Sequence, residues 1–335
     1  MSIPVRSTDP ICVNLCYVFA GLDLAKLTRL SKTLGPEAFN KYYKKLSGFK
    51  LNKLSELSDS ALRATGNLLN QGVDTAEINK VIKLFGKPKH SSLFLQRIKN
   101  KDQLDTIMSW NEPTLEKLIR LFSTTGDSTV DARRIAGKVV DNYDIENIDK
   151  WLFEAGGHVG TKEQLIRYEF NLDDAIELSQ KGEKVELEVN YYKGKKIIET
   201  ELEKIKELPE FESVYHISFD TVTDTQNREL KYISEVTNKE NLANQLKAVG
   251  KKLKKAQFKS KYAGGPKENV VILRYDLEKL NFPQEIIFNR INSYLTKKEQ
   301  DYLVNHIDKV IIQFQTKDSL QETIIDLIEL EGKVK

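Results

Sequence analysis

The most constraining feature of this chain is a change of hydrophobic pattern at three closely spaced glycines, Gly156, Gly157 and Gly160. Before them, apolar residues recur at helical spacing and no extended run alternates with a period of two. After them, alternating or wholly apolar segments predict strands. The sequence therefore predicts an α+β protein, with an all-helical domain over residues 1–157 and a mixed α/β domain over residues 158–335.

The helical part reads as short helices separated by Gly and Pro, with no clean repeat at a fixed period. Residues 1–155 carry 23 basic and 18 acidic side chains, a net charge of +5. We expect an irregular helical bundle or array, with a role in delivery, packaging or interaction. A length of 335 residues suits two domains.

The second part is expected to alternate helices and strands. A helix should begin at Thr161 and end near Gly182, and residues 197–208 could be either a hairpin strand or a helix. The tail after residue 314 is expected to be one more helix. The expected strands are residues 185–191, 214–222, 229–237, 270–275 and 310–314, with an amphipathic helix over 241–258 and a helical stretch after Pro283.

Two cysteines, Cys12 and Cys16, are too few for a disulfide framework and are expected to be buried thiols. The apolar run over residues 11–22 is too short to span a bilayer, so no membrane-spanning segment is expected. No conventional secretion signal is visible. We expect a cytoplasmic protein in the producing cell, which another machine would have to deliver if it acts elsewhere.

Acidic side chains gather on two of the expected strands. Asp220 ends the first, on the face of His216, while Glu229, Lys231 and Glu235 alternate along the second. Carboxylates on one sheet face repel each other unless a cation joins them, and hard oxygen ligands suit Mg²⁺ or Mn²⁺. The alternative interpretation is a solvated face of an antiparallel hairpin.

Two further features favour a functional site. Glu169 falls in the core-facing stripe of the helix after Thr161, where an unpaired carboxylate is costly. Residues 247–267 hold eight lysines and no acid, a pattern that could bind a phosphate backbone or simply solubilise a helix. The residues of the expected helix that could approach nucleic acid are Gln245, Lys247, Lys251, Lys252 and Lys255.

In the order of these elements, residues 160–316 resemble the PD-(D/E)xK nuclease superfamily, in particular the C-terminal nuclease domains of bacterial polymorphic and contact-dependent toxins. The resemblance implies a restriction-endonuclease-like fold. It also implies that Asp220 and Glu235 bind the metal, that Glu169 is the helix acid and that Gln245 is the polar residue of the following helix.

The position two residues after Glu235 departs from this pattern, because Thr237 stands where the family has a lysine. Lys231 or Lys252 could substitute from nearby, or the site could be inactive. Glu229 and Lys231 also form a literal E-x-K, nine residues after Asp220, and this pair remains an alternative motif.

The resemblance implies a metal-dependent nuclease, a toxin effector that cleaves DNA or RNA and needs a cognate immunity protein. Asp220, Glu235, Lys231 and Glu169 would be catalytic, with Mg²⁺ or Mn²⁺ as cofactor. Two alternatives stay open: a catalytically inactive nuclease-fold protein that binds nucleic acid or a partner, and a helical interaction scaffold.

Overall fold

The computed structural model describes residues 24–45, 53–159, 161–193, 195–212, 216–255, 267–296 and 307–327. Cys12, Cys16 and the apolar run over residues 11–22 lie outside these ranges. The chain divides into two compact units, Met1–Tyr143 and Asp144–Lys335. None of the helices in the described ranges is long and apolar enough to cross a membrane.

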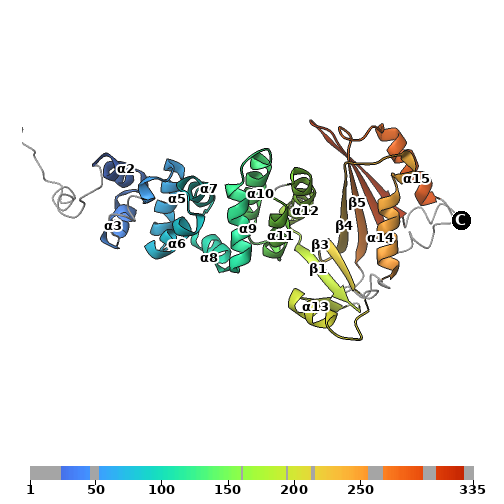
Figure 1. Cartoon of the computed structure of the whole chain (residues 1–335), viewed down its shortest axis with the longest axis horizontal. Coiled ribbons are helices and arrows are strands. Elements are labelled where there is room, and N and C mark those ends of the chain that lie inside the picture. Colours follow the sequence, from blue (N-terminus) through green and yellow to red (C-terminus); the bar gives the residue numbers. More distant parts are fainter. Residues whose placement is uncertain are drawn as a thin grey trace, which may run out of the picture. The chain divides into compact units, whose positions relative to one another are not determined.

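The first unit is helical throughout its described residues, as predicted (Figure 1). Its helices are α2 (Leu24–Leu34), α3 (Pro36–Lys45), α5 (Asp59–Asn70), α6 (Thr75–Phe85), α7 (Pro88–Leu95), α8 (Lys101–Ser109), α9 (Glu112–Ser123) and α10 (Thr129–Asp141).

Polar caps explain where several of these helices begin. Asp74 accepts a hydrogen bond from the Ala76 nitrogen, and Glu77 accepts one from the Asp74 nitrogen, which together close a capping box at the start of α6. Gly86 ends α6 with a φ of +69°, a conformation that favours glycine. Apolar side chains facing inward from successive helices then form the core of the unit.

The second unit holds a seven-stranded sheet of order β2-β1-β3-β4-β5-β6-β7. Strands β4, β5 and β6 are parallel, and the remaining neighbours pair antiparallel. The strands are β1 (Glu186–Tyr192), β2 (Lys195–Ile197), β3 (His216–Val222), β4 (Gln226–Ile233), β5 (Glu268–Asp276), β6 (Lys309–Gln315) and β7 (Leu320–Asp326).

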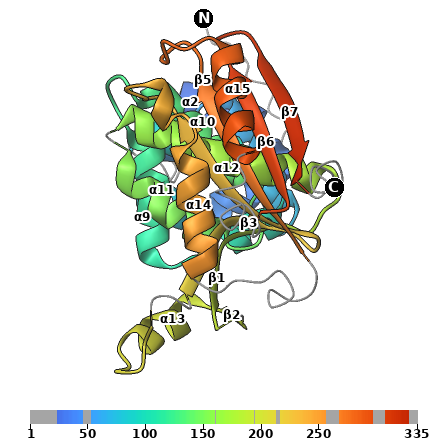
Figure 2. The same ribbon diagram turned by 90° about the vertical axis from the view of Figure 1, so that its right-hand side faces the viewer.

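Helices cover both faces of this sheet. The helical elements of the unit are α11 (Ile148–Ala155), η1 (Gly156–His158), α12 (Lys162–Gln180), α13 (Glu199–Lys206), η3 (Lys239–Asn241), α14 (Asn244–Lys255) and α15 (Gln284–Thr296). Helix α12 lies on one face of the sheet, and α14 and α15 lie on the other (Figures 1 and 2).

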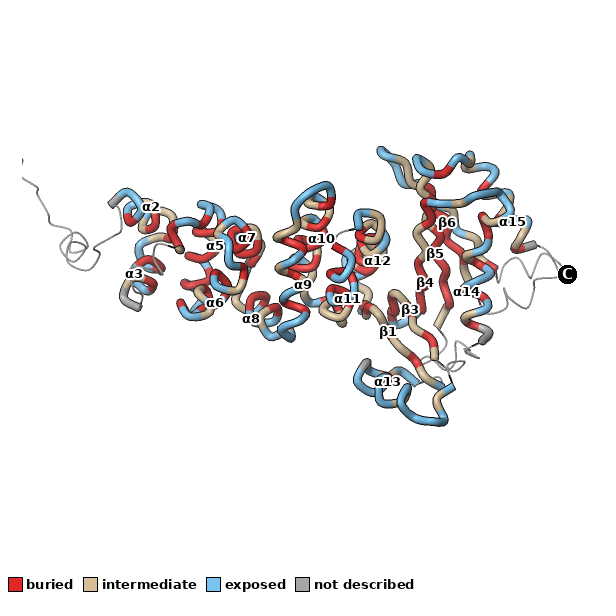
Figure 3. Tube along the Cα trace, in the orientation of Figure 1, coloured by how far each residue is buried: buried red, intermediate tan, exposed pale blue. Residues whose placement is uncertain are grey.

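The core of the second unit therefore has two layers. Phe170 of α12 packs with Leu230 and Ile272 on one face, and α14 and α15 pack on the larger apolar cluster of the other face. Strand β5 contributes to both clusters, which confirms the prediction of a central strand buried on both faces. Burial concentrates in the central strands β4, β5 and β6, whereas the edge strand β7 and helix α13 are mostly exposed (Figure 3).

Two expectations need correction, and one that was left open is resolved. The strand predicted over residues 229–237 is β4, Gln226–Ile233, so Glu235 and Thr237 lie beyond its end. The tail predicted as a helix instead forms strand β7, where Thr323, Ile324 and Ile325 supply the β-branched side chains that strands favour. Residues 197–208 contain both the end of β2 and helix α13.

The two compact units meet in sequence at Tyr143, ahead of the expected boundary at residue 157. The Leu187 nitrogen donates a hydrogen bond to the Glu146 carbonyl oxygen at 3.0 Å, so the segment before α11 is attached to strand β1. Helix α11 therefore belongs to the sheet-containing unit.

Candidate functional site

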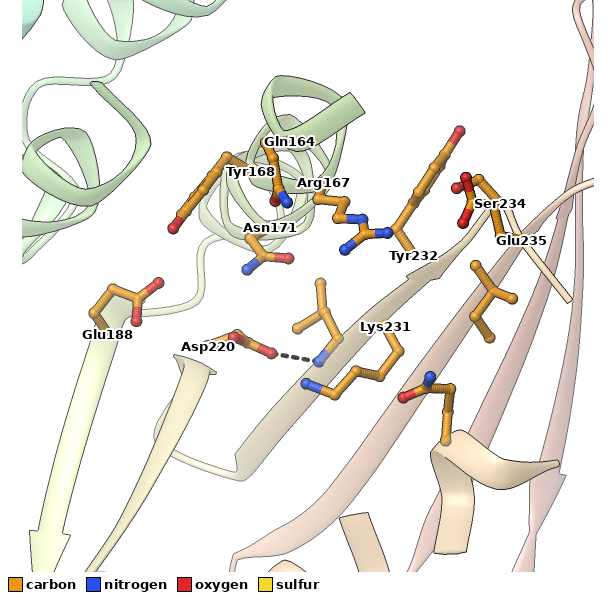
Figure 4. A pocket seen from close by; sticks show the side chains of 13 residues that line it. Gln164, Arg167, Tyr168, Asn171, Glu188, Asp220, Lys231, Tyr232, Ser234 and Glu235 are labelled. Atoms are coloured by element: carbon orange, nitrogen blue, oxygen red, sulfur yellow. Dashed lines mark hydrogen bonds between the residues drawn. The ribbon is translucent and has the colours of Figure 1, made fainter. Parts of the chain in front are cut away.

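A fork between strands β3 and β4 forms the centre of the site. The two strands pair at Thr221 with Arg228 and at Val222 with Asn227. Where they separate, the Leu230 nitrogen loses a backbone partner, and Oδ2 of Asp220 accepts its hydrogen bond at 2.6 Å (Figure 4). A buried amide needs such an acceptor, so strand separation positions the Asp220 carboxylate at the fork.

Glu229 on β4 is the most enclosed acid at the fork. Its side chain is 5% exposed, and its two oxygens accept hydrogen bonds from Lys231 Nζ at 2.6 Å and Lys252 Nζ at 2.7 Å. Burial alone would raise the pKa of Glu229, but the two lysines outweigh it and lower that pKa. Glu229 therefore stays ionised and organises one lysine from β4 and one from α14.

Asp220 belongs to the same electrostatic cluster. Burial, followed by the charge of Glu229, raises the pKa of Asp220 to about 6, while Lys231 and Lys252 act against that rise. Burial acts to lower the pKa of Lys231, but Glu229 and then Asp220 raise it overall. The ammonium group thus remains charged between two carboxylates.

Glu188 on β1 adds a third acid that sequence reasoning missed. The flanking pairs, Leu187 with Thr221 and Val189 with Phe219, put Glu188 opposite Asp220. Glu188 has a φ of +49°, an unusual and costly conformation for a residue with a side chain. Burial, and then the charge of Asp220, raises the pKa of Glu188 to about 8.

Asp220, Glu188 and Lys231 border a cavity of about 460 Å³, whereas Glu229 and Lys252 are not among its lining residues. One wall is a face of α12, where residues at positions i, i+3, i+4 and i+7 lie along the cavity (Figure 4). The fork supplies the opposite wall, and the segment after β4 closes one end. The lining residues are Gln164, Arg167, Tyr168, Asn171, Glu188, Asp220, Leu230, Lys231, Tyr232, Ile233, Ser234, Glu235 and Gln245.

The other residues that the resemblance assigned to the motif lie in different positions relative to the cavity. Glu235 borders the cavity but is exposed, because β4 has already ended at Ile233. Thr237 is exposed and accepts a hydrogen bond from Asn241. Glu169 is buried within α12, at 6% exposure, and is not among the lining residues of the cavity.

The predicted residues of α14 also separate. Gln245 lines the cavity, and Lys252 reaches Glu229. Lys247 and Lys251 are exposed on the helix, and the side chain of Lys255 lies outside the described part of the chain. The helix thus contributes to the site through one carboxamide and one ammonium group, and leaves two lysines open to solvent.

His216 lies at the start of β3, apart from the fork. Its Nε2 is 3.0 Å from Oδ1 of Asn190 on β1. Burial lowers the pKa of His216, so the ring is neutral at physiological pH. His216 is not among the residues that line the cavity.

The carboxylate oxygens at the fork are of the type that binds a hard cation, although they are not already arranged as a metal site. Within the described ranges, no group of three or more His, Cys, Asp and Glu side chains is arranged as a metal site. Asp220 and Glu229 nevertheless offer hard oxygen atoms of the kind that Mg²⁺ and Mn²⁺ prefer. Burial, and then the neighbouring acids, raise the pKa values of Asp220 and Glu188, and a bound cation would oppose that rise.

No family model matches this chain, and neither a curated protein nor a solved structure matches it. All three comparisons are thus without a match.

Proposed function

We propose that this protein is a metal-dependent nuclease and that the fork between β3 and β4 is its active site. The observation that carries the proposal is the meeting of Asp220, Glu229 and Lys231 at one point, with Lys231 Nζ 2.6 Å from Glu229. Two acids can hold a metal that activates a water molecule for hydrolysis of a phosphodiester, and a lysine can stabilise the negative charge that develops.

The order of elements supports the resemblance to the PD-(D/E)xK superfamily. Helix α12 precedes strands β1, β3 and β4, which are antiparallel neighbours, and α14 then leads to the parallel strand β5. The α12–β5 segment is thus our candidate for a restriction-endonuclease-like fold. The same order brings the Asp of β3 beside the E-x-K of β4.

Of the two motif assignments that the sequence left open, the proposal adopts Glu229 with Lys231. Glu229 lies in the strand beside Asp220, whereas Glu235 lies beyond the strand end. Thr237 then no longer occupies the lysine position. The alternative of a catalytically inactive binding protein rested mainly on the missing lysine, so this assignment removes its main argument.

In this proposal Asp220 and Glu229 hold Mg²⁺ or Mn²⁺. The bound ion would supply an activated water and neutralise charge on the phosphate. Lys252 has to share or release Glu229 when the ion binds, because both Glu229 oxygens are hydrogen-bonded to lysines. Lys231 orients the attacking water and stabilises the developing negative charge. The exposed Lys247 and Lys251 contact the nucleic-acid backbone.

The test is a cleavage assay with full-length protein, plasmid DNA and total RNA, in Mg²⁺, Mn²⁺ or EDTA. Cleavage should require the metal and should be lost in Asp220→Ala and Glu229→Gln. Glu235→Gln is the matched control, because it borders the same cavity without belonging to the cluster. Metal-independent cleavage, or loss of cleavage in Glu235→Gln alone, would contradict this assignment.

The resemblance extends the proposal to a toxin effector that is paired with an immunity protein, with the helical unit serving delivery. Induced expression in bacterial cells should then stop growth, and Lys231→Met should abolish that arrest. Normal growth of cells that express the native protein, at the same soluble level as Lys231→Met, would contradict the toxin interpretation. The nuclease proposal would then be decided by the cleavage assay alone.

A further inference from the structure

Helix α12 forms one wall of the cavity, and the residues of this wall have no part in the proposed hydrolysis. Gln164, Arg167, Tyr168 and Asn171 lie on one face of this helix and line the cavity across from Asp220 (Figure 4). None of the four belongs to the acid and lysine cluster. They are therefore free to recognise the substrate rather than to react with it.

The polar chemistry of this wall suits a nucleobase. Across the described part of the chain, the carboxamides of Gln164 and Asn171 are not hydrogen-bonded to other side chains or to the backbone. A carboxamide offers both donors and an acceptor, which match the hydrogen-bonding edge of a base. Arg167 is exposed and adds a positive charge that can pair with a neighbouring phosphate.

Tyr168 lines the cavity and packs against two aromatic neighbours. Its ring stacks on His158, with centroids 5.3 Å apart and planes inclined by 22°. Trp151 meets the same ring edge-on at 6.2 Å. Since these neighbours are on α11 and η1, which belong to the same unit, the tyrosine is oriented before any ligand arrives. Preorganised aromatic rings bind bases by stacking.

The size of the cavity suits one nucleotide. A volume of about 460 Å³ fits a group the size of one nucleotide and falls within the range of small-ligand pockets. A base inside an intact duplex is stacked on both sides and cannot reach such a wall. Only a single strand, or a nucleotide that leaves the stack, can place a base against Tyr168.

We propose that the α12 wall, with Tyr168 as its stacking surface, recognises one unpaired nucleotide, so that the protein acts on single-stranded or locally unpaired nucleic acid. The substrate preference rests on the nuclease function proposed above. The recognition of the base by α12 can be measured without cleavage.

The first experiment compares three labelled substrates of one sequence, in the nucleic acid that the full-length protein cleaves. These are a single strand, a blunt duplex and a duplex with a four-nucleotide unpaired stretch. Unpaired substrates should be cleaved at least tenfold faster, with cuts inside the unpaired stretch. Equal rates on the blunt duplex would overturn the proposal.

The second experiment measures binding by Asp220→Asn protein to DNA and RNA strands that contain 2-aminopurine, whose fluorescence falls on stacking. Tyr168→Leu should weaken binding about tenfold and restore the fluorescence. Tyr168→Phe should retain both the affinity and the low fluorescence of the stacked base. Tyr192→Leu is the matched control, because Tyr192 stacks on Phe211 with a similar geometry, 5.6 Å and 21°, outside the cavity. Circular dichroism confirms that each variant is folded.

The two experiments separate the two proposals. If no substrate is cleaved but 2-aminopurine binding depends on Tyr168, the nuclease function fails and recognition by α12 stands. If substrates are cleaved and Tyr168→Leu behaves like Tyr192→Leu, recognition by α12 is wrong and the nuclease function stands. Absence of both cleavage and binding would overturn both.

Discussion

Lys231 Nζ lies 2.6 Å from Oε1 of Glu229, two residues earlier on the same strand. Residues at this spacing share one face of a strand, so the ion pair follows directly from the sequence E-x-K. The neighbouring strand then adds Asp220, whose charge helps to keep the lysine protonated. A pair within one strand and one contact from the neighbouring strand together make the candidate catalytic cluster.

Removing the ammonium group should stop catalysis without unfolding the protein. We expect Lys231→Met to lower kcat by about 100-fold or more, since a preorganised charge at the reacting phosphate typically contributes this much. KM should change little, because this charge acts mainly on the transition state. The measurement is steady-state cleavage in Mg²⁺, with Lys247→Met as the control, an exposed lysine that should affect KM more than kcat. A fully active Lys231→Met protein would place the catalytic cation elsewhere.

Glu188 should make stability depend on pH in the absence of metal. Its pKa is raised from an ordinary 4.5 to about 8 in the folded protein. The folded state thus favours the protonated form, and the resulting stability is fully present below pH 4.5 and is lost as the pH rises through 8. Glu188→Gln, which carries no charge, should match the native protein near pH 4.5 and exceed its stability by about 1–3 kcal/mol at pH 9.

Urea unfolding in EDTA at several pH values measures this difference. Glu186→Gln is the control, on the same strand. A constant difference between Glu188→Gln and native protein across the pH range would show that Glu188 is not held protonated.

The site shows which parts of a fold can be predicted from sequence. The buried strand β5 and the order of helices and strands in the second unit follow largely from hydrophobic periodicity, which burial enforces. Periodicity could not decide between Glu229 and Glu235, because each has one apolar neighbour and only the end of β4 separates them. Strand ends depend on tertiary pairing, which no local pattern reports.

Glu188 was missed for a related reason. In the sequence it is one of several alternating acids on an expected half-buried strand, and nothing marks it as different from Glu186. Only the register between β1 and β3 puts it opposite Asp220, and its positive φ is invisible to a pattern. The tail was mispredicted because β7 depends on hairpin pairing with β6, which the pattern of the tail alone does not report.

The buried pair between α12 and β4 should be sensitive to loss of either partner. Arg228 donates to both oxygens of Asp174, at 2.9 and 2.6 Å, and the two side chains are 9% and 8% exposed. Asp174→Asn leaves a buried guanidinium without its counter-charge and should cost about 3–5 kcal/mol. Urea unfolding gives the value. Glu177→Gln on the same helix, which breaks the exposed pair with Lys181, should cost less than about 0.5 kcal/mol.

The packing of α5 on α2 in the first unit depends on a glycine, Gly66, where the two backbones come close together. A Cβ atom at Gly66 would lie 2.4 Å from the carbonyl oxygen of Leu34, and a backbone atom cannot move aside as the end of a flexible side chain can. Gly66→Ala should therefore destabilise the helical unit by about 1–3 kcal/mol, although alanine favours a helix by up to about 1 kcal/mol.

Urea unfolding of the full chain, followed by far-UV circular dichroism, measures the effect of Gly66→Ala. Gly157→Ala is the control, because a Cβ there meets no atom within 4 Å and the variant should be nearly neutral. Helix propensity alone predicts that Gly66→Ala is stabilising. A gain in stability would mean that the α2 and α5 backbones are farther apart than the structure has them, whereas a loss confined to Gly66→Ala requires their close approach.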